Sequence, residues 1–311
     1  MRLSHRVLCV YGVDFVNTGG EKCEQVMLAL KRYLSENIAE GKYADNYKGG
    51  VYKMKKIAVI TGGATGIGKA AAKKLAKEGY SLALIYNSSK APAEAAKAEI
   101  EAEGAECRLY QADVSKEDEC KRVFNEIGED CGRIDTFINC AGVTKYIRFS
   151  DLDSVTADVW DKLLGVNLIG AFNCCREASK QMKKNGGGSI VIVASLAGVR
   201  ASGSSIPYDA SKAAIIHTAK CLAMALAPDI RVNTVSPGIV TDTAWHRDDP
   251  SYNKEAADAR EAAFIPLGYV TKPDEVADSI VFLATDRSSN ITGIDLVIDG
   301  GRKEVHHGQV Y

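Results

Sequence analysis

The sequence is poor in aromatic residues and has no excess of charge of either sign. Phe, Trp and Tyr make up 7% of the 311 residues, and 39 Lys and Arg stand against 40 Asp and Glu. No run of basic residues is longer than two. Because binding to a phosphate backbone depends on clustered positive charge, we expect no nucleic-acid partner.

Long hydrophobic runs are also missing. A stretch such as residues 190–194 is far shorter than the roughly 20 residues that cross a bilayer. Near the N-terminus, the apolar segment 7–13 is interrupted by Gly12 and lacks a small-residue cleavage site. We therefore expect neither a membrane partner nor a signal peptide.

The nine cysteines form no recognisable metal or disulfide pattern. None lies in a Cys-x-x-Cys pair, and Cys174 and Cys175 are adjacent. An odd, unpatterned set of this kind argues against a zinc site and against a disulfide scaffold. It favours free thiols in a reducing cytoplasm, and no bound metal is expected.

From Lys55 onward the sequence alternates short β-branched segments with longer helical ones. This alternation is typical of βαβ units and a parallel sheet. Residues 68–78 and 91–103, rich in Ala and Lys, predict the first two helices. We expect a single doubly wound α/β domain with a seven-stranded parallel sheet flanked by helices. The predicted strands are residues 56–61, 81–86, 106–111, 136–139, 189–194, 231–236 and 295–298.

Residues 1–53 fall outside this pattern. They predict one strand at 6–10 and one amphipathic helix at 21–38. A single strand and a single helix bury too little surface to be stable alone. One interpretation is therefore a genuine N-terminal extension that docks on the edge of the sheet.

The other interpretation is a misassigned start. Met54 stands directly before the first predicted core strand, and Lys48-Gly49-Gly50 can be encoded by a purine-rich ribosome-binding sequence. Our hypothesis is that the native chain begins at Met54 in a bacterial gene. The intact mass of the protein from its native source distinguishes the two interpretations.

A glycine-rich turn joins the first predicted strand to the first helix. It reads Thr61-Gly62-Gly63-Ala64-Thr65-Gly66-Ile67-Gly68. Glycines allow a tight turn and close backbone approach, and the free N–H groups of a helix N-terminus attract a pyrophosphate. The spacing Gly-x-x-x-Gly-x-Gly differs from the commonest dinucleotide fingerprint, so a turn without a ligand is the alternative interpretation.

Four polar side chains follow at ordered spacings. Tyr208 and Lys212 lie one helical turn apart on one face. Ser195 directly follows a predicted strand, and Asn167 precedes it in Val166-Asn167-Leu168. Taken singly, each has an ordinary structural interpretation: a strand-end cap for Ser195, a surface pair for Tyr208 and Lys212, and a helix-bending residue for Asn167.

These residues and their surroundings resemble the short-chain dehydrogenase/reductase family. The resemblance covers Lys55 to about Gly301 and implies a Rossmann-like catalytic domain at residues 54–311 that assembles as a homotetramer. The matching motifs are the glycine turn, Asp113-Val114, Asn139-Cys140-Ala141-Gly142, Asn167, Ser195, Tyr208, Lys212, Arg231-Val232-Asn233, Ser236-Pro237-Gly238, Ile291-Thr292-Gly293 and Asp299-Gly300-Gly301.

The chemistry that these side chains suit is carbonyl reduction, which needs a hydride donor and an acid at the carbonyl oxygen. A Tyr hydroxyl can be that acid if its pKa falls from about 10. A fall of about three units requires roughly 4 kcal/mol in favour of the phenolate. The ammonium of Lys212, helped by the positive ring of the oxidised nicotinamide, is expected to supply this free energy.

The resemblance gives each catalytic residue a role. Tyr208 is implied to be the general acid in reduction and the general base in oxidation, and Ser195 to hydrogen-bond the substrate oxygen. Lys212 is implied to lower the pKa of Tyr208 and to bind the nicotinamide ribose. Asn167 is implied to hold a water that relays protons to Lys212.

We expect NADP as the preferred cofactor, with NAD possible. The second predicted strand ends in Tyr86-Asn87-Ser88-Ser89-Lys90, which has no carboxylate to repel a 2'-phosphate. Against NADP, Thr65 stands where NADP-preferring relatives often carry a cation. Asp113 is expected to contact adenine or, alternatively, to cap a helix beginning near Ser115. The expected cofactor residues are Gly62, Ala64, Thr65, Gly66, Ile67, Gly68, Tyr86, Asn87, Ser88, Asp113, Val114, Asn139, Ala141, Gly142, Tyr208, Lys212, Pro237, Gly238, Ile239, Thr241 and Thr243.

Two further segments are expected around the substrate. Where the family usually has a Thr that holds the nicotinamide carboxamide, this chain has Asp242, so Thr241 or Thr243 is expected to take that role. Residues 242–266 are expected to cover the substrate, and residues 146–148 and 202–206 to form other walls. The cover contains Trp245, His246, Tyr252 and Phe264.

We therefore expect an NAD(P)-dependent oxidoreductase that transfers hydride between NADPH and a ketone or secondary alcohol, similar to 3-oxoacyl-(acyl-carrier-protein) reductases. Its substrate would be a small-molecule ketone or thioester. Hydroxysteroid and sugar dehydrogenases carry the same motifs and stay as alternatives. A non-catalytic NADP-sensing or scaffold protein is the alternative from another class, and the intact set of four reactive residues argues against it.

Overall fold

The computed structural model describes residues 55–243 and 253–302. The expectations for residues 1–53, including the strand at 6–10, the helix at 21–38 and the start at Met54, lie outside the described residues. So do the expectations for Trp245, His246 and Tyr252. Among the described residues, no helix is long and apolar enough to cross a membrane, and no group of three or more His, Cys, Asp or Glu side chains could hold a metal ion.

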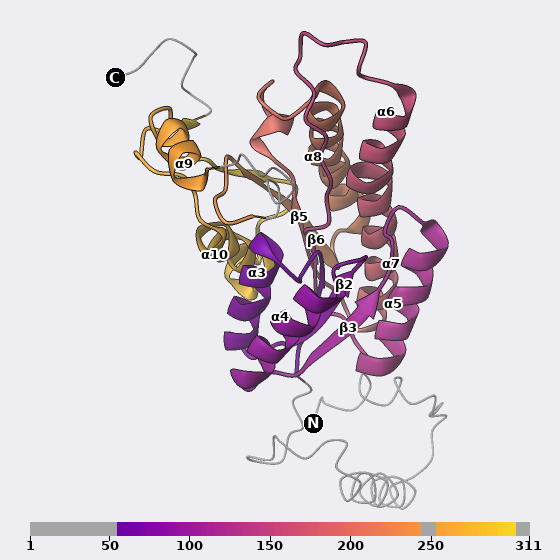
Figure 1. The fold of residues 1–311 in the computed structure, drawn as a ribbon. Helices are drawn as coiled ribbons and strands as arrows, with labels where there is room; N and C mark the ends of the chain where they lie inside the picture. Colours follow the sequence, from indigo (N-terminus) through magenta and orange to yellow (C-terminus); the bar gives the residue numbers. More distant parts are fainter. Residues whose placement is uncertain (1–54, 244–252, 303–311) are drawn as a thin grey trace, which may run out of the picture. The chain divides into compact units, whose positions relative to one another are not determined.

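Seven parallel strands form one sheet in the order β3-β2-β1-β4-β5-β6-β7. Figure 1 shows this sheet among the helices that surround it. The predicted α/β fold is confirmed, and each predicted strand end lies within one residue of the observed one. The strands are β1 Ile57–Thr61, β2 Ser81–Tyr86, β3 Cys107–Gln111, β4 Thr136–Asn139, β5 Gly188–Val193, β6 Ile230–Pro237 and β7 Asp295–Ile298.

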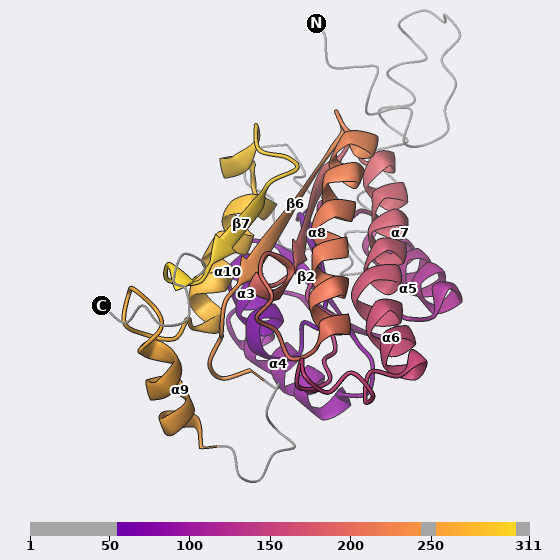
Figure 2. The ribbon, with the colours of Figure 1, turned by 90° about the horizontal axis from the view of Figure 1, so that it is seen from above.

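Helices cover both faces of the sheet (Figure 2). One face packs against α3, α4 and α10, and the other against α5, α7 and α8. The helices are α3 Gly66–Lys77, α4 Lys90–Ala102, α5 Glu117–Cys131, α6 Ala157–Leu164, the π-helix η2 Gly165–Gly170, α7 Ala171–Lys184, the 3-10 helix η3 Leu196–Gly198, α8 Ile206–Leu226, α9 Lys254–Ala262, α10 Pro273–Ala284 and the 3-10 helix η5 Asp286–Ser288.

The sheet is apolar on both sides because both sides are buried. Along β1, Ile57 and Val59 pack into the core under α5, α7 and α8, while Ala58 and Ile60 pack into the core under α3, α4 and α10. Successive side chains of a strand point to opposite faces, so a strand with two buried faces is apolar at every position. This is why β1 and β2 are visible in the sequence as nearly continuous apolar segments.

The strand order reverses between β1 and β4, since β2 and β3 lie on one side of β1 and β4 to β7 on the other. The loops after β1 and β4 therefore separate over a crevice at the carboxyl ends of the strands. At the base of this crevice the two loops touch, because the N–H of Cys140 donates to the oxygen of Thr61 (3.1 Å).

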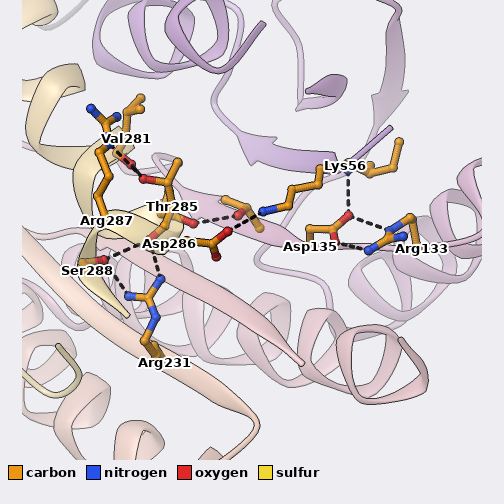
Figure 3. Close-up of polar contacts among 12 residues, drawn as sticks. Lys56, Arg133, Asp135, Arg231, Val281, Thr285, Asp286, Arg287 and Ser288 are labelled. Carbon is orange, nitrogen blue, oxygen red and sulfur yellow. Dashed lines mark hydrogen bonds and ion pairs between the residues drawn. The ribbon is translucent and has the colours of Figure 1, made fainter. Parts of the chain in front are cut away.

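Polar contacts tie the elements together at the opposite, amino ends of the strands (Figure 3). Asp135 accepts hydrogen bonds from the backbone N–H of Ile57 (2.9 Å) and from Nε of Arg133 (2.8 Å). Arg231 donates to the backbone oxygens of Leu283 (2.9 Å) and Thr285 (3.0 Å), which end α10. Cations suit the exposed carbonyls at a helix C-terminus, so Arg231 fixes the end of α10 to β6.

Candidate active site

A cavity of about 1150 Å³ lies at the carboxyl ends of the strands. Its lining comes from the segments that follow β1 to β6, together with residues of α8 and α9. Doubly wound folds bind dinucleotides in this crevice. The expected cofactor residues that line it are Gly62, Ala64, Thr65, Gly66, Ile67, Gly68, Tyr86, Asn87, Ser88, Asp113, Val114, Ala141, Gly142, Tyr208, Lys212, Pro237, Gly238, Ile239 and Thr243.

The glycine turn brings the N-terminus of α3 to this cavity. Gly62 has a left-handed backbone (φ 65°), which glycine adopts without strain. Gly68 packs so closely on the turn that a Cβ atom there would lie 2.3 Å from the backbone oxygen of Gly62. The first N–H groups of α3 have no partner within the helix, and they therefore suit the phosphates of a dinucleotide.

Asn139 lies behind the cavity instead of lining it. It is buried at the end of β4, where its Oδ1 accepts a hydrogen bond from the Thr61 hydroxyl (3.1 Å). That hydroxyl also accepts from the N–H of Ala141 (3.2 Å). Asn139 thus supports the loop that carries Ala141 and Gly142 into the cavity.

Residues after β2 and β3 form the part of the cavity expected to hold the adenosine. Asn87 and Ser88 line it, and the side-chain nitrogen of Gln111 donates to the backbone oxygen of Asn87 (2.9 Å). Asp113 lines the cavity too, while its Oδ1 accepts from the N–H (2.9 Å) and the hydroxyl (2.7 Å) of Ser115. Asp113 therefore fixes the turn before α5 and faces the cavity, while its contact with adenine stays a prediction.

Tyr208 and Ser195 meet at the cavity. Tyr208 lies in the first turn of α8 and is buried. Ser195 follows β5 and hydrogen-bonds Tyr208, and its oxygen also accepts from the N–H of Ala197 (3.2 Å). Ser195 therefore caps η3 and lies against the phenol, while its hydrogen bond to a substrate oxygen stays a prediction.

The pKa of Tyr208 is raised above its ordinary value. Burial is the main cause, the nearby Asp209 and Tyr146 add to it, and the hydrogen bond with Ser195 opposes it. The expected lowering by Lys212 is not found in the protein by itself. The Lys212 ammonium lies 5.8 Å from the centre of the Tyr208 ring, and burial is the largest influence on the pKa of this phenol.

Lys212 is a buried cation at the cavity wall. Its Nζ donates to the backbone oxygen of Val193 (3.1 Å). Burial lowers the pKa of Lys212 to about 8, and the neighbouring Cys140 thiol opposes this. Both Lys212 and Cys140 line the cavity, so the ammonium is accessible to a ligand there.

Asn167 lies in the π-helix η2, between α6 and α7. Its side chain accepts from the N–H of Val143 (2.9 Å) and donates to the oxygen of Val143 (3.0 Å) and the hydroxyl of Ser211 (3.1 Å). A Cβ atom on Gly142 would lie 3.5 Å from Asn167 Oδ1 and 3.6 Å from Lys212 Nζ. Asn167 and Lys212 therefore face the same glycine, while the water between them stays a prediction. Single π turns are frequent at functional sites.

The two candidate threonines after Gly238 face different ways. Asp242, between them, has a left-handed backbone (φ 54°), which Asp tolerates better than most residues. Thr241 is buried and donates to Asp258 (2.8 Å), whereas Thr243 lines the cavity. Thr243 is thus the one that a ligand in the cavity can reach.

Part of the expected cover borders the cavity. Residues 257, 258, 260 and 261, which belong to α9, line it, as do residues 146–148 and 202–204. Arg302 also lines the cavity and pairs with Glu261 (2.6 Å), a contact that the sequence reasoning missed. The available signal was its position directly after the motif Asp299-Gly300-Gly301.

Comparisons with known proteins find relatives of this chain. A family model described as enoyl-(acyl carrier protein) reductase matches residues 62–303. The 3-oxoacyl-(acyl-carrier-protein) reductase FabG of Staphylococcus epidermidis is 35% identical over 255 residues, which are 80% of this chain and 99% of that protein. D-threitol dehydrogenase of Mycolicibacterium smegmatis is 35% identical and covers 79% of this chain and 92% of its own. The crystal structure of levodione reductase matches with a TM-score of 0.75 and 31% identity, over 82% of this chain and 100% of that one.

The chain belongs to the short-chain dehydrogenase/reductase family. Within that family it is an NAD(P)-dependent oxidoreductase similar to the 3-oxoacyl reductases.

Proposed function

We propose that this protein is an NADPH-dependent carbonyl reductase that acts on a small-molecule ketone or thioester similar to a 3-oxoacyl thioester. The observation that carries the proposal is the convergence of Ser195, Tyr208 and Lys212 in one cavity with the glycine turn. Oxidation of the corresponding secondary alcohol uses the same residues in reverse.

The chain's own residues handle the proton and the substrate oxygen. The cofactor, when bound, supplies the hydride. Tyr208 gives its proton to the carbonyl oxygen while Ser195 donates a hydrogen bond to the same atom. Burial raises the pKa of Tyr208 in the protein by itself, so the phenol is protonated at neutral pH but is a weak acid. The positive charges of Lys212 and of the oxidised nicotinamide, when the cofactor is bound, would lower this pKa and ease the proton transfer. Asn167 and Lys212 return a proton to Tyr208 through water.

The test is consumption of NADPH and NADH with a panel of acetoacetyl thioester, keto-steroids, keto-sugars and diketones. We expect the thioester and NADPH to give the highest kcat/KM. Tyr208→Phe keeps the ring and removes the acid, so turnover should fall about 100-fold or more with little change in the Kd for NADPH. Turnover retained by Tyr208→Phe would contradict the assignment of Tyr208. Binding of NADPH without turnover of any compound would favour the NADP-sensing alternative.

The preference for NADP rests on the residues after β2. Tyr86, Asn87 and Ser88 line the cavity without a carboxylate among them. Tyr86→Asp places a negative charge where it would accept hydrogen bonds from a ribose and repel a 2'-phosphate. We expect the ratio of kcat/KM for NADPH to that for NADH to fall by about tenfold or more. An unchanged ratio would place cofactor selection elsewhere.

A polyol or sugar dehydrogenase is the second candidate function. The similarity to D-threitol dehydrogenase, which equals the similarity to the 3-oxoacyl reductase in identity, favours it. Oxidation of tetritols and pentitols in the same assay distinguishes the two, because a thioester reductase should leave them unchanged.

We also propose a homotetramer in a bacterial cytoplasm, with the native chain starting at Met54. Ile169, Phe172 and Met224 expose apolar surface on the neighbouring segments η2, α7 and α8, and Met224 is 85% exposed. Apolar surface of this kind is typical of subunit interfaces. Light scattering measures the number of subunits, and a monomer would contradict the homotetramer. The intact mass of the protein from its native source identifies its first residue, and a species beginning at Met1 would contradict the start at Met54.

A further inference from the structure

Asp209, which directly follows Tyr208, holds a loop of the cavity wall in place. Oδ2 of Asp209 accepts hydrogen bonds from the backbone N–H groups of Ser202 (3.0 Å) and Gly203 (3.2 Å). These two groups belong to the segment between η3 and α8, which has no ladder to satisfy them. Asp209 therefore accepts the backbone hydrogen bonds that a neighbouring strand would accept in a sheet.

The loop held in this way lies directly on the catalytic ring. A Cβ atom on Gly203 would lie 1.9 Å from Asp209 Oδ1, 2.8 Å from the Ala197 Cβ and 2.9 Å from Cδ1 of Tyr208. Only a glycine fits between the carboxylate and the phenol. The position of Gly203 thus limits how the Tyr208 ring can turn.

The same loop carries a second wall of the cavity. The backbone oxygen of Ser204 accepts from the N–H of Ile147 (2.9 Å), and its hydroxyl is hydrogen-bonded to that of Thr144. Residues 202–204 and 146–149 all line the cavity. A shift of the Gly203 backbone would therefore pass through Ser204 to the segment after β4.

A carboxylate at this position needs a reason, because its second oxygen is not satisfied. Among the described residues, Oδ1 of Asp209 is buried without a hydrogen-bond partner, and burial raises the pKa of this carboxyl. An unsatisfied buried polar atom destabilises a fold. An amide of the same shape would bring two N–H donors to the same place, with no acceptor for them.

We propose that Asp209 is a positioning residue of the active site, which holds residues 202–204 against the Tyr208 ring and thereby sets the shape of the substrate wall. It acts through Tyr208 and the loop and does not touch the reacting atoms. The expected changes in kcat and KM rest on the proposed reductase function. The expected changes in the loop rest only on the contacts of Asp209.

The kinetic test compares Asp209→Ala and Asp209→Asn with Asp278→Ala, which removes an exposed carboxylate from α10. The substrate is the ketone with the highest kcat/KM for the wild type. We expect Asp209→Ala to lower kcat/KM by about tenfold or more, through both kcat and KM, since small misplacements of catalytic groups reduce rates by this order. The Kd for NADPH should change less than about twofold. Gly203→Ala should reproduce the loss, because it displaces the same loop from the other side.

The pH profile separates positioning at the ring from general loosening. The groups that face Tyr208 are Ser195, Lys212, Tyr146 and Asp209, with Cys140 beside Lys212. The negative charge of Asp209 raises the pKa of Tyr208, so Asp209→Asn should lower it. Oxidation needs the deprotonated phenol, so the acid limb of the oxidation rate should move to lower pH in Asp209→Asn. A merely structural role leaves this limb in place.

Amide hydrogen exchange of the full chain gives a readout that does not depend on turnover. In Asp209→Ala we expect faster exchange in residues 202–204 and at Ile147, and unchanged exchange in β1 and β4. If the wild type reduces no ketone, the proposed function fails, yet this exchange still tests the contacts. Exchange and kcat/KM that both match Asp278→Ala would overturn the proposal.

Discussion

Lys212 carries a charge in a nearly fully buried position, and its Nζ donates a hydrogen bond to the backbone oxygen of Val193. Burial lowers its pKa from 10.5 to about 8. The folded state therefore holds this proton less tightly than the unfolded state. Below about pH 8 the folded protein bears the unfavourable free energy of a buried charge, and that penalty disappears as the pH rises toward 10.5.

Replacing Lys212 with Met should therefore stabilise the fold while abolishing turnover. Each pKa unit corresponds to about 1.4 kcal/mol, and the lost hydrogen bond to Val193 offsets part of the gain. We expect the free energy of unfolding at pH 7 to rise by about 1–3 kcal/mol. Urea denaturation at pH 7 and at pH 10 measures it, with Lys220→Met on the exposed side of α8 as the control. The difference between variant and wild type should shrink at the higher pH, and a less stable variant at pH 7 would refute the argument.

For single residues, the sequence predicts which side chains meet in the site better than it predicts their pKa values. The spacing of Ser195, Tyr208 and Lys212 is enough to bring them together, because one strand end and one helix face determine it. The raised pKa of Tyr208 could not be predicted from this spacing. That pKa depends on burial of the ring against segments such as Gly203, which nothing in the local pattern links to the phenol.

Among the elements, α3 depends on a close contact with the turn before it. Gly68→Ala should improve intrinsic helix propensity by about 1 kcal/mol, yet the new Cβ would lie 2.3 Å from the Gly62 oxygen. The backbone has to move, and the N–H groups that we expect to bind the phosphates move with it. We expect the Kd for NADPH, measured by fluorescence titration, to rise by about tenfold or more. Lys77→Ala, at the exposed end of the same helix, should leave it unchanged.

An unchanged Kd in Gly68→Ala would mean that the turn relaxes without moving the phosphate site. A lowered Tm of Gly68→Ala with an unchanged Kd would then show that the substitution strains the fold without affecting cofactor binding.

Helix η2 shows what the sequence cannot predict about an element. Residues 165–170 have an ordinary apolar helical pattern, and nothing in Val166-Asn167-Leu168 announces a π turn. The widened turn arises where Asn167 bonds both the loop after β4 and α8. Contacts between elements that are distant in the chain decide its geometry.

For the whole molecule, the doubly wound sheet follows from the sequence because the central strands are buried on both faces and the helices that cover the sheet are buried on one. The conformation of the segment after β6 is harder to predict from the sequence. Whether Thr241 or Thr243 reaches the cavity depends on the left-handed backbone of Asp242, and the contact between Glu261 and Arg302 joins residues far apart in the chain. Loops of this kind are positioned by tertiary contacts, which periodicity does not encode.

The polar contacts at the amino ends of the strands have an evolutionary consequence. Arg231 and Asp135 bind the frame at the end of the sheet that lies away from the cavity. Substitutions of Arg231 or Asp135 should therefore change the stability of the fold without changing the choice of substrate. Natural or directed evolution can alter stability at this end of the strands while the lining of the cavity stays the same.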